Sequence, residues 1–306
     1  MKFTLGGTVE HILVLGAGAS VEYGLPTWKE LSVLIKEKII KDTENRYQHK
    51  KEMLAWVDKV GDTSDKYTTI DECIFKESIK KEYHSNGYEI EKQIFLVIRD
   101  IFSEEYTEYD QGWIRVFNDK VLSDPKESLE NNIAFINYNY DDVLDKNIIN
   151  FSYLPQKHQQ GNYKERLNAL SGAVVNILYP HGNLFSRQEA EYDSRIARHV
   201  DTMKTDYSEC LDAVSCHDSK SHVVSSYTKK LGVKLYILGL GGGLEVNLNK
   251  LGFTYLNKVF EIHVTINDVS RKEEIIKFLS DKYEIPPGEI RVYVDCKELV
   301  EKCFNN

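Results

Sequence analysis

The sequence predicts an α/β fold in which helices cover both faces of a parallel β-sheet. Short apolar runs alternate along the chain with segments of helical periodicity, and each apolar run ends in a polar or glycine-rich loop. Residues 29–130 show helical patterns without a clear strand. We therefore expect a large helical insertion at 29–130, after the first strand–helix unit, within a single domain that spans residues 1–306.

The first elements are a strand, a tight turn and a helix. His11–Leu15 (HILVL) is one histidine followed by four strand-forming apolar residues, which is typical of a buried strand. The next five residues, GAGAS, predict a tight turn, and we expect a helix to begin at Ser20. Four amphipathic helical patterns follow, with apolar residues three and four apart: 31–40, 51–60, 69–83 and 90–102.

The remaining strands are expected further along the chain. Apolar runs predict them at 133–136, 174–178, 235–238, 260–266 and 290–294, with a helix at 271–282 and a short helix at the end. In parallel sheets of this kind, ligands bind beyond the carboxyl ends of the strands. Four loops at those ends carry unusual residues, and we expect them to meet around one crevice: 16–20, 137–142, 179–183 and 239–247.

Composition and charge weigh against several classes of function. The net charge is −9 at pH 7, so a nucleic-acid groove would have to form against the overall charge. No apolar run reaches the roughly 18 residues of a membrane helix, and the N-terminus has no secretory leader pattern. The five cysteines are scattered, as in the reducing cytosol. We expect a cytoplasmic protein that contacts neither nucleic acid nor membrane directly.

The GAGAS turn only partly matches the fingerprint of nicotinamide dehydrogenases. That fingerprint, G-x-G-x-x-G or a final Ala, needs an acidic residue about 20 residues on, after a second strand. Gly16 and Gly18 fit, but Val21 takes the third glycine position and the next segment is helical. A simple dehydrogenase is therefore not expected. Two interpretations remain: a Rossmann-like turn that approaches a phosphate, with Ser20 donating to it or capping the helix, and a tight turn without a ligand.

The turn continues into a more specific string. GAGAS runs into Tyr23–Trp28 (YGLPTW). This string resembles the first motif of the sirtuin-like superfamily, in which GAG-x-S is followed by a G-[IL]-P turn. The P-x-W element and the helix that follows it are similar to the bacterial sirtuin-like NAD hydrolases of anti-phage defence. The resemblance implies a Rossmann-like fold that binds NAD⁺.

Further stretches agree with this resemblance in order and spacing. Thr69–Asp71 resembles a Ser/Thr-Ile-Asp element, and Phe135–Asp142 resembles a T-N-Y-D motif with Tyr138 where threonine is usual. Tyr179–Gly182 resembles an H-G motif, and Leu238–Asn247 resembles a late glycine and serine loop in which glycine replaces the serine. The N-Y-N-Y and H-G blocks are also similar to the AbiH abortive-infection family, whose usual first loop, G-N-G-F-D, differs from GAGAS.

The resemblance implies a role for each matching residue. Asn139 and Asp141 are implied at the nicotinamide end of bound NAD⁺, and His181 is implied as the catalytic histidine near the ribose. A histidine with an ordinary pKa can take a proton from water or a ribose hydroxyl at neutral pH. The implied cofactor-binding set wraps the phosphates and lines the adenosine side: Gly16, Ala17, Gly18, Ser20, Pro26, Thr27, Gly239 and Gly241.

Each catalytic assignment has a structural alternative. Asp141 or Asp142 could cap a helix that begins at Val143. His181 could be a strand-end histidine whose ring nitrogens are satisfied by hydrogen bonds. Asn139 could hold a turn through an Asx contact.

One cluster of potential metal ligands stands out. Cys210, Cys216, His217 and His222 have the spacing C-x₅-C-H-x₄-H, which differs from the paired C-x₂₋₄-C of structural zinc sites. We therefore expect a polar loop over 201–226 and no metal. Protein-deacylating sirtuins typically carry a four-cysteine zinc module. Its absence from this sequence favours water over a peptide lysine as the acceptor.

These features lead to the hypothesis of an NAD⁺ glycohydrolase, which cleaves its substrate NAD⁺ to nicotinamide and ADP-ribose. Its expected role is that of a defence effector that depletes cellular NAD⁺. Two alternatives stay open: an NAD-dependent protein deacylase, and a non-catalytic subunit that senses NAD⁺ or ADP-ribose. By analogy with the family, we expect a homo-oligomer and an activating partner, such as a helicase-like ATPase or an Argonaute-type protein.

Overall fold

A computed structural model of the chain describes residues 11–62, 87–107, 112–122, 133–144, 147, 174–178, 233–241, 244–245, 248 and 259–304. Within this part of the chain, six parallel strands form one sheet in the order β3-β2-β1-β4-β5-β6. The strands are β1 (His11–Leu15), β2 (Ile133–Asn137), β3 (Val174–Leu178), β4 (Val233–Leu238), β5 (Val259–Thr265) and β6 (Ile290–Tyr293). This is the strand order of Rossmann-like sheets, so the predicted fold class is confirmed.

Four of the six described α-helices lie between β1 and β2, one lies between β5 and β6, and one follows β6. The six helices are α1 (Trp28–Lys41), α2 (Lys50–Asp62), α5 (Gly87–Glu105), α6 (Trp113–Phe117), α14 (Lys272–Tyr283) and α15 (Cys296–Cys303). Every described element between β1 and β2 is helical, and the bounds 29–130 of the insertion stay a prediction. The predicted helix at 69–83 lies outside the described residues.

The segment after β1 differs from its prediction. A 3₁₀ helix, η1 (Ala17–Tyr23), replaces the helix that was expected to begin at Ser20. It begins earlier because the Ala19 N–H already donates to the Gly16 carbonyl at 2.8 Å, three residues back. It ends at Gly24, whose φ of 83° a residue with a side chain rarely adopts.

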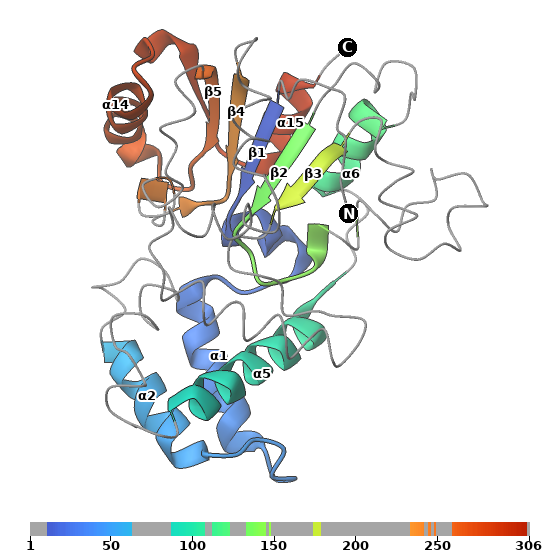
Figure 1. Cartoon of the computed structure of the whole chain (residues 1–306), viewed down its shortest axis with the longest axis vertical. Coiled ribbons are helices and arrows are strands. Elements are labelled where there is room, and N and C mark those ends of the chain that lie inside the picture. Colours follow the sequence, from blue (N-terminus) through green and yellow to red (C-terminus); the bar gives the residue numbers. More distant parts are fainter. Residues whose placement is uncertain are drawn as a thin grey trace, which may run out of the picture.

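Helices cover both faces of the sheet, and each face has its own apolar core. Successive side chains of a strand point to opposite faces, so β1 contributes Leu13 and Leu15 to one core and Ile12 and Val14 to the other. The first core also contains residues of α1, α2, α5, α6 and α15, and the second contains residues of α14. Figure 1 shows α14 on one side of the sheet and α15 on the other.

Helices α1, α2 and α5 pack on one another beyond the carboxyl edge of the sheet (Figure 1). Along α5, the buried residues Ile90, Ile94, Ile98 and Ile101 repeat three or four positions apart, so they share one face of the helix. These side chains belong to the same core as Leu13 and Leu15 of β1. The helical layer is therefore packed continuously with one face of the sheet.

Candidate functional site

The described parts of the predicted site loops lie at the carboxyl edge of the sheet, where the strand order reverses. β1 and β4 are neighbours, paired in register from His11 with Lys234 to Leu15 with Leu238. The segment η1 follows β1, and the turn at Gly239 follows β4. In open α/β sheets, ligands bind in the crevice outside such a reversal. The structure therefore brings the first and last predicted loops together at a position suited to a nucleotide.

The loops after β1 and β4 are joined by backbone hydrogen bonds. The Gly16 N–H donates to the Leu238 carbonyl at 2.9 Å, and the Gly18 N–H donates to the Gly239 carbonyl at 2.9 Å. Both donors are therefore used within the protein. Ala17 and Gly18 are the exposed residues of the loop, so a phosphate bound here would meet them first.

Close packing of these loops explains three of the predicted glycines. A Cβ at Gly16 would lie 2.8 Å from the Gly239 oxygen, and one at Gly18 would lie 2.9 Å from the Gly239 Cα. Gly239 itself has a φ of 67°, and a Cβ there would lie 2.0 Å from the Ala19 nitrogen. These contacts require glycine whether or not a ligand binds.

Ser20 and Asn139 meet at the base of the predicted site. The Asn139 side-chain Nδ2 donates to the Ser20 Oγ at 3.0 Å, although the two residues are 119 positions apart in the chain. Ser20 is 3% exposed and Asn139 is 6% exposed. A hydroxyl that accepts one hydrogen bond still has a proton to donate. The pair therefore presents an oriented amide and a hydroxyl in a nearly dry position.

Asn137 holds the turn that presents Asn139. Its Oδ1 accepts the Asn139 backbone N–H at 3.0 Å, and the Tyr138 N–H donates to the Leu15 carbonyl at 3.0 Å. The predicted Asx contact therefore exists, but Asn137 makes it and not Asn139. The sequence contained the signal for this turn: an Asx turn joins an asparagine side chain to the backbone two residues later, and Asn137 lies two residues before Asn139.

Asp141 has the structural contact that the sequence raised as an alternative. Its Oδ1 accepts the Val143 N–H at 3.0 Å, at the first helical residue after the turn, and its side chain is buried. This bond fits a helix cap. A second role at the nicotinamide end of the substrate stays a prediction.

Thr27 also has a structural role. It precedes α1, and both its backbone N–H and its Oγ1 donate to the Glu30 Oε2 at 2.8 Å. These hydrogen bonds lower the pKa of the Glu30 carboxyl below its ordinary value. The arrangement is a capping box that fixes the start of the helix. Pro26 is partly exposed beside it, and a contact of either residue with NAD⁺ stays a prediction.

Several predicted residues lie outside the described part of the chain. β3 is described as far as Leu178, and His181 comes three residues later. The possible metal ligands Cys210, Cys216, His217 and His222 are also outside it. Gly241 is described: its φ is 51°, and a Cβ there would meet nothing within 4 Å.

Three hydrogen bonds that the sequence did not predict brace the site. The Trp113 Nε1 donates to the Ala19 carbonyl at 2.7 Å, and the Trp113 backbone N–H donates to the Glu22 Oε1 at 2.6 Å. The pKa of the Glu22 carboxyl is raised because burial is the larger effect; the hydrogen bond from Trp113 acts in the opposite direction. On the β4 side, the Gly239 N–H donates to the Thr265 Oγ1 at 2.8 Å. Each contact joins segments that are distant in the sequence, so no local pattern indicates it.

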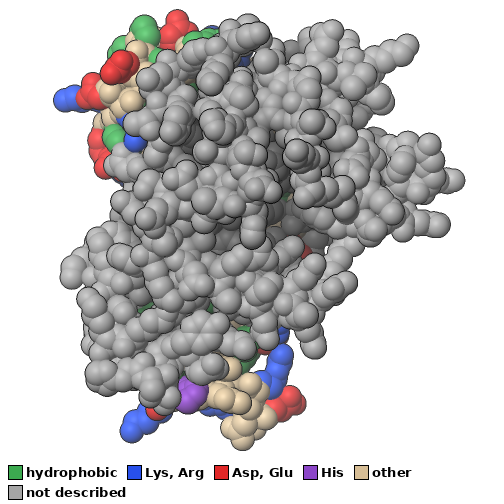
Figure 2. Space-filling model, viewed as in Figure 1, with side chains coloured by type: hydrophobic (Ala, Val, Ile, Leu, Met, Phe, Trp, Pro, Cys, Tyr) green, Lys and Arg blue, Asp and Glu red, His purple; other side chains and the backbone are tan. Residues whose placement is uncertain are grey.

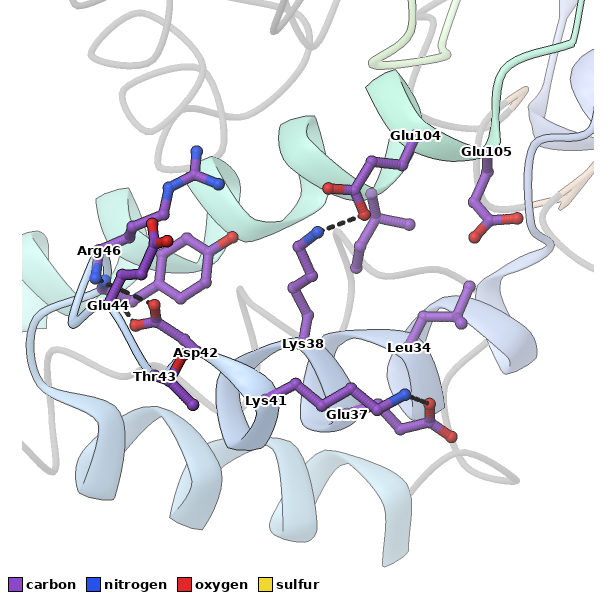
Figure 3. Close-up of a pocket in the computed structure, with 12 residues that line it drawn as sticks. Leu34, Glu37, Lys38, Lys41, Asp42, Thr43, Glu44, Arg46, Glu104 and Glu105 are labelled. Carbon is purple, nitrogen blue, oxygen red and sulfur yellow. Dashed lines mark hydrogen bonds and ion pairs between the residues drawn. The ribbon is translucent and has the colours of Figure 1, made fainter.

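A cavity of about 430 Å³ lies elsewhere, between α1 and α5 (Figure 3). Its cations are matched by acids, since Lys38 pairs with Glu104 and Lys41 pairs with Glu37. Among the described residues of the predicted NAD⁺ site, none lines it. We therefore place the candidate site at the carboxyl edge of the sheet and not in this groove.

Charges of both signs are mixed on the described surface. Figure 2 shows that surface as two separate patches on this side of the molecule, and each contains basic and acidic side chains. Among the described residues, no three His, Cys, Asp or Glu side chains form a group that could hold a metal ion. None of the described helices has the length and apolar character needed to cross a membrane.

No protein-family model matches the chain, and a search of curated proteins found no significant match.

Proposed function

We propose that this protein is an NAD⁺ glycohydrolase that releases nicotinamide and ADP-ribose. The observation that carries the proposal is the buried Asn139–Ser20 pair at the carboxyl edge of a Rossmann-like sheet. Asn139 and Ser20 come from two motifs of the resemblance, 119 residues apart, and they are in direct contact. The strand order reverses beside them, between β1 and β4, which is where such sheets bind dinucleotides.

The proposed reaction needs little acid catalysis. The bond between nicotinamide and ribose breaks through a centre with oxocarbenium character, and nicotinamide leaves as a neutral molecule because it is a cation when bound. The site must orient a water and the ribose, and it must exclude bulk solvent. A carboxamide both donates and accepts hydrogen bonds, so Asn139 suits the task of holding a ribose hydroxyl and a water. His181 is proposed as the base that takes the proton from that water.

The remaining substrate contacts are assigned to the two glycine loops. The exposed backbone of Ala17 and Gly18 is proposed to meet the pyrophosphate. Gly239 and Gly241 are proposed to border the adenosine side. As an effector, the enzyme would deplete cellular NAD⁺ once assembly or a partner activates it.

One observation favours the non-catalytic alternative. The N–H groups of Gly16 and Gly18 and the carboxylate of Asp141 are already bonded within the protein. A subunit that only binds NAD⁺ or ADP-ribose would need fewer polar groups at the site than an enzyme does.

The test is release of nicotinamide from NAD⁺ by the purified full chain, followed by chromatography without any acylated peptide. We expect turnover in the wild type and a loss of about a hundredfold or more in Asn139→Ala and in His181→Ala. Gln48→Ala is the matched control, because it removes an exposed carboxamide in the connection between α1 and α2. Its rate should equal that of the wild type.

Each alternative has its own result. Turnover that requires an acylated lysine peptide would identify a deacylase. Calorimetric binding of NAD⁺ without turnover, in the presence or absence of such a peptide, would identify a sensing subunit. Full activity of Asn139→Ala would remove the proposed site.

A further inference from the structure

His263 of β5 is contacted at both ring nitrogens. Its Nδ1 lies 3.0 Å from the Cys303 Sγ at the end of α15, and its Nε2 lies 3.1 Å from the Glu261 Oε1 on its own strand. His263 and Glu261 are buried, and Cys303 is partly exposed. A thiol, an imidazole and a carboxylate are thus arranged in series. None of the three belongs to the proposed NAD⁺ site.

Glu261 determines which nitrogen of His263 carries the proton. Lys234 Nζ lies 2.9 Å from one carboxylate oxygen, and the Arg291 guanidinium lies 3.3 Å from the other. Burial by itself raises the pKa of the Glu261 carboxyl. The hydrogen bond from Lys234 and the nearby positive charges lower it by more, so the pKa stays below its ordinary value. An ionised carboxylate can only accept, so Nε2 is the protonated nitrogen and Nδ1 has the lone pair. That lone pair lies beside the thiol.

Two donors share the Nδ1 lone pair. The Tyr293 hydroxyl lies 2.9 Å from Nδ1, and the Cys303 Sγ lies 3.5 Å from that hydroxyl. Burial lowers the pKa of His263 to about 4 and raises the pKa of the Cys303 thiol. Thiol and imidazole are therefore both neutral at pH 7. Sulfur becomes a good nucleophile here only if its proton moves to a base during the reaction.

We propose that Cys303 is a modification site for hydroperoxides, with His263 as the base that receives the thiol proton and Glu261 as the residue that orients the ring. The sulfur attacks one peroxide oxygen, so an S–O bond forms and the O–O bond breaks. The attacked oxygen is the one that bears hydrogen, and the thiol proton passes to Nδ1 and then to the departing group: an alkoxide that leaves as an alcohol or, from hydrogen peroxide, a hydroxide that leaves as water. Sulfur is oxidised by two electrons to a sulfenic acid, and the peroxide is reduced. The imidazole ends neutral, as it began.

Partial exposure favours a small oxidant over a larger substrate. The thiol is accessible only in part, while the imidazole and carboxylate behind it are buried. Cys296, on the same helix, provides the internal comparison. It is buried, its polar contact is the Thr265 Oγ1 at 4.0 Å, and burial raises the pKa of its thiol to about 12. Within the described part of the chain, Cys303 therefore has a base beside its thiol, and Cys296 has a hydroxyl as its hydrogen-bonding partner.

The experiment is peroxide oxidation of the reduced full chain in the presence of dimedone, which traps sulfenic acids, with the labelled peptides quantified by mass spectrometry. In the wild type, we expect Cys303 to be trapped at least about tenfold faster than Cys296. His263→Gln should slow the trapping of Cys303 about tenfold or more, because the base is removed. Tyr293→Phe should keep or increase the rate, because Nδ1 is then left to the thiol alone.

Three results would overturn the proposal. The first is trapping of Cys303 no faster than that of Cys296. The second is an unchanged Cys303 rate in His263→Gln whose circular dichroism matches the wild type. The third is a loss in Tyr293→Phe as large as in His263→Gln, which would make the hydroxyl the proton acceptor. If His263→Gln does not fold, Glu261→Gln takes its place. A several-fold slower trapping of Cys303 in Glu261→Gln would support the proposal, and an unchanged rate would overturn it.

Discussion

Gly239 and Gly241 lie in the same turn after β4, and both have positive φ angles, of 67° and 51°. Their surroundings differ. A Cβ at Gly239 would overlap the backbone of the η1 segment, while a Cβ at Gly241 would enter open space. Single residues at this edge therefore carry two distinct constraints, one from the backbone conformation and one from the opposing loop.

This difference predicts unequal effects of the same substitution. Gly241→Ala should lower the free energy of unfolding by about 1–2 kcal/mol, because only the left-handed conformation is penalised. Gly239→Ala should cost at least about 2 kcal/mol more, because the β1 and β4 loops must also separate. Urea unfolding of both variants measures the difference. Equal losses would contradict the close packing of the two loops.

Helix α1 shows how one element combines a local and a distant signal. Thr27 and Glu30 form its capping box within four residues, as the sequence spacing allows. Its buried residues Leu31, Ile35 and Ile39 lie four apart, so they form one stripe that belongs to the first core. The start of the helix is therefore determined locally, and its orientation is determined by packing.

The capping box gives a prediction for α1. Thr27→Ala should lower the free energy of unfolding by about 1 kcal/mol, because the threonine hydroxyl no longer contributes to the box. Thr27→Ser is the control and should remain close to the wild type. Thermal unfolding of both variants measures this loss. A Thr27→Ala variant as stable as the wild type would show that the cap adds no stability. A change in NAD⁺ affinity beyond this loss would support the predicted contact of Thr27 with the substrate.

At the scale of the whole molecule, a row of rings crosses one face of the sheet. His11 of β1, Tyr236 of β4, His263 of β5 and Tyr293 of β6 stack in sequence, with ring centroids 5.6, 5.0 and 5.7 Å apart. The stacked rings connect four strands, and hydrogen bonds join His11 to Tyr236 and His263 to Tyr293. Burial lowers the pKa of His11 to about 4, as it does for His263.

These two histidines predict a loss of stability in mild acid. The folded protein keeps both rings neutral down to about pH 4, whereas histidines in the unfolded chain take up protons near pH 6.5. Their contribution is therefore complete above pH 6.5 and declines as the pH falls toward 4. The slope is at most about 1.4 kcal/mol per pH unit for each histidine.

Urea unfolding at pH 7.5 and pH 5.0 measures this effect, and the midpoint should be lower at pH 5.0. His11→Phe keeps a ring in the row, but phenylalanine does not titrate. The loss of stability between pH 7.5 and pH 5.0 should therefore be smaller in this variant by the contribution of one of the two histidines. The same pH dependence in this variant and the wild type would show that His11 does not contribute.

Much of the fold could be read from the sequence because its signals are local. Alternating and three-to-four periodicities depend on neighbouring residues, so the six strands and the helix after β5 were predicted within a few residues. The expectation that these loops share the carboxyl edge followed from the predicted parallel arrangement, whereas the order of the strands did not. The start of η1 was missed, because an i to i+3 bond within GAGAS has no clear local signature.

By itself, the sequence determined which residues form strands and helices and which loops share an edge, since those properties depend on periodicity along the chain. Only the tertiary structure decided the pairing of Ser20 with Asn139, the packing of Gly18 against Gly239, and the placement of Cys303 beside His263. The physical reason is that each contact joins segments brought together by the strand order. Hydrophobic patterns specify that a residue is buried, but they do not specify its neighbour.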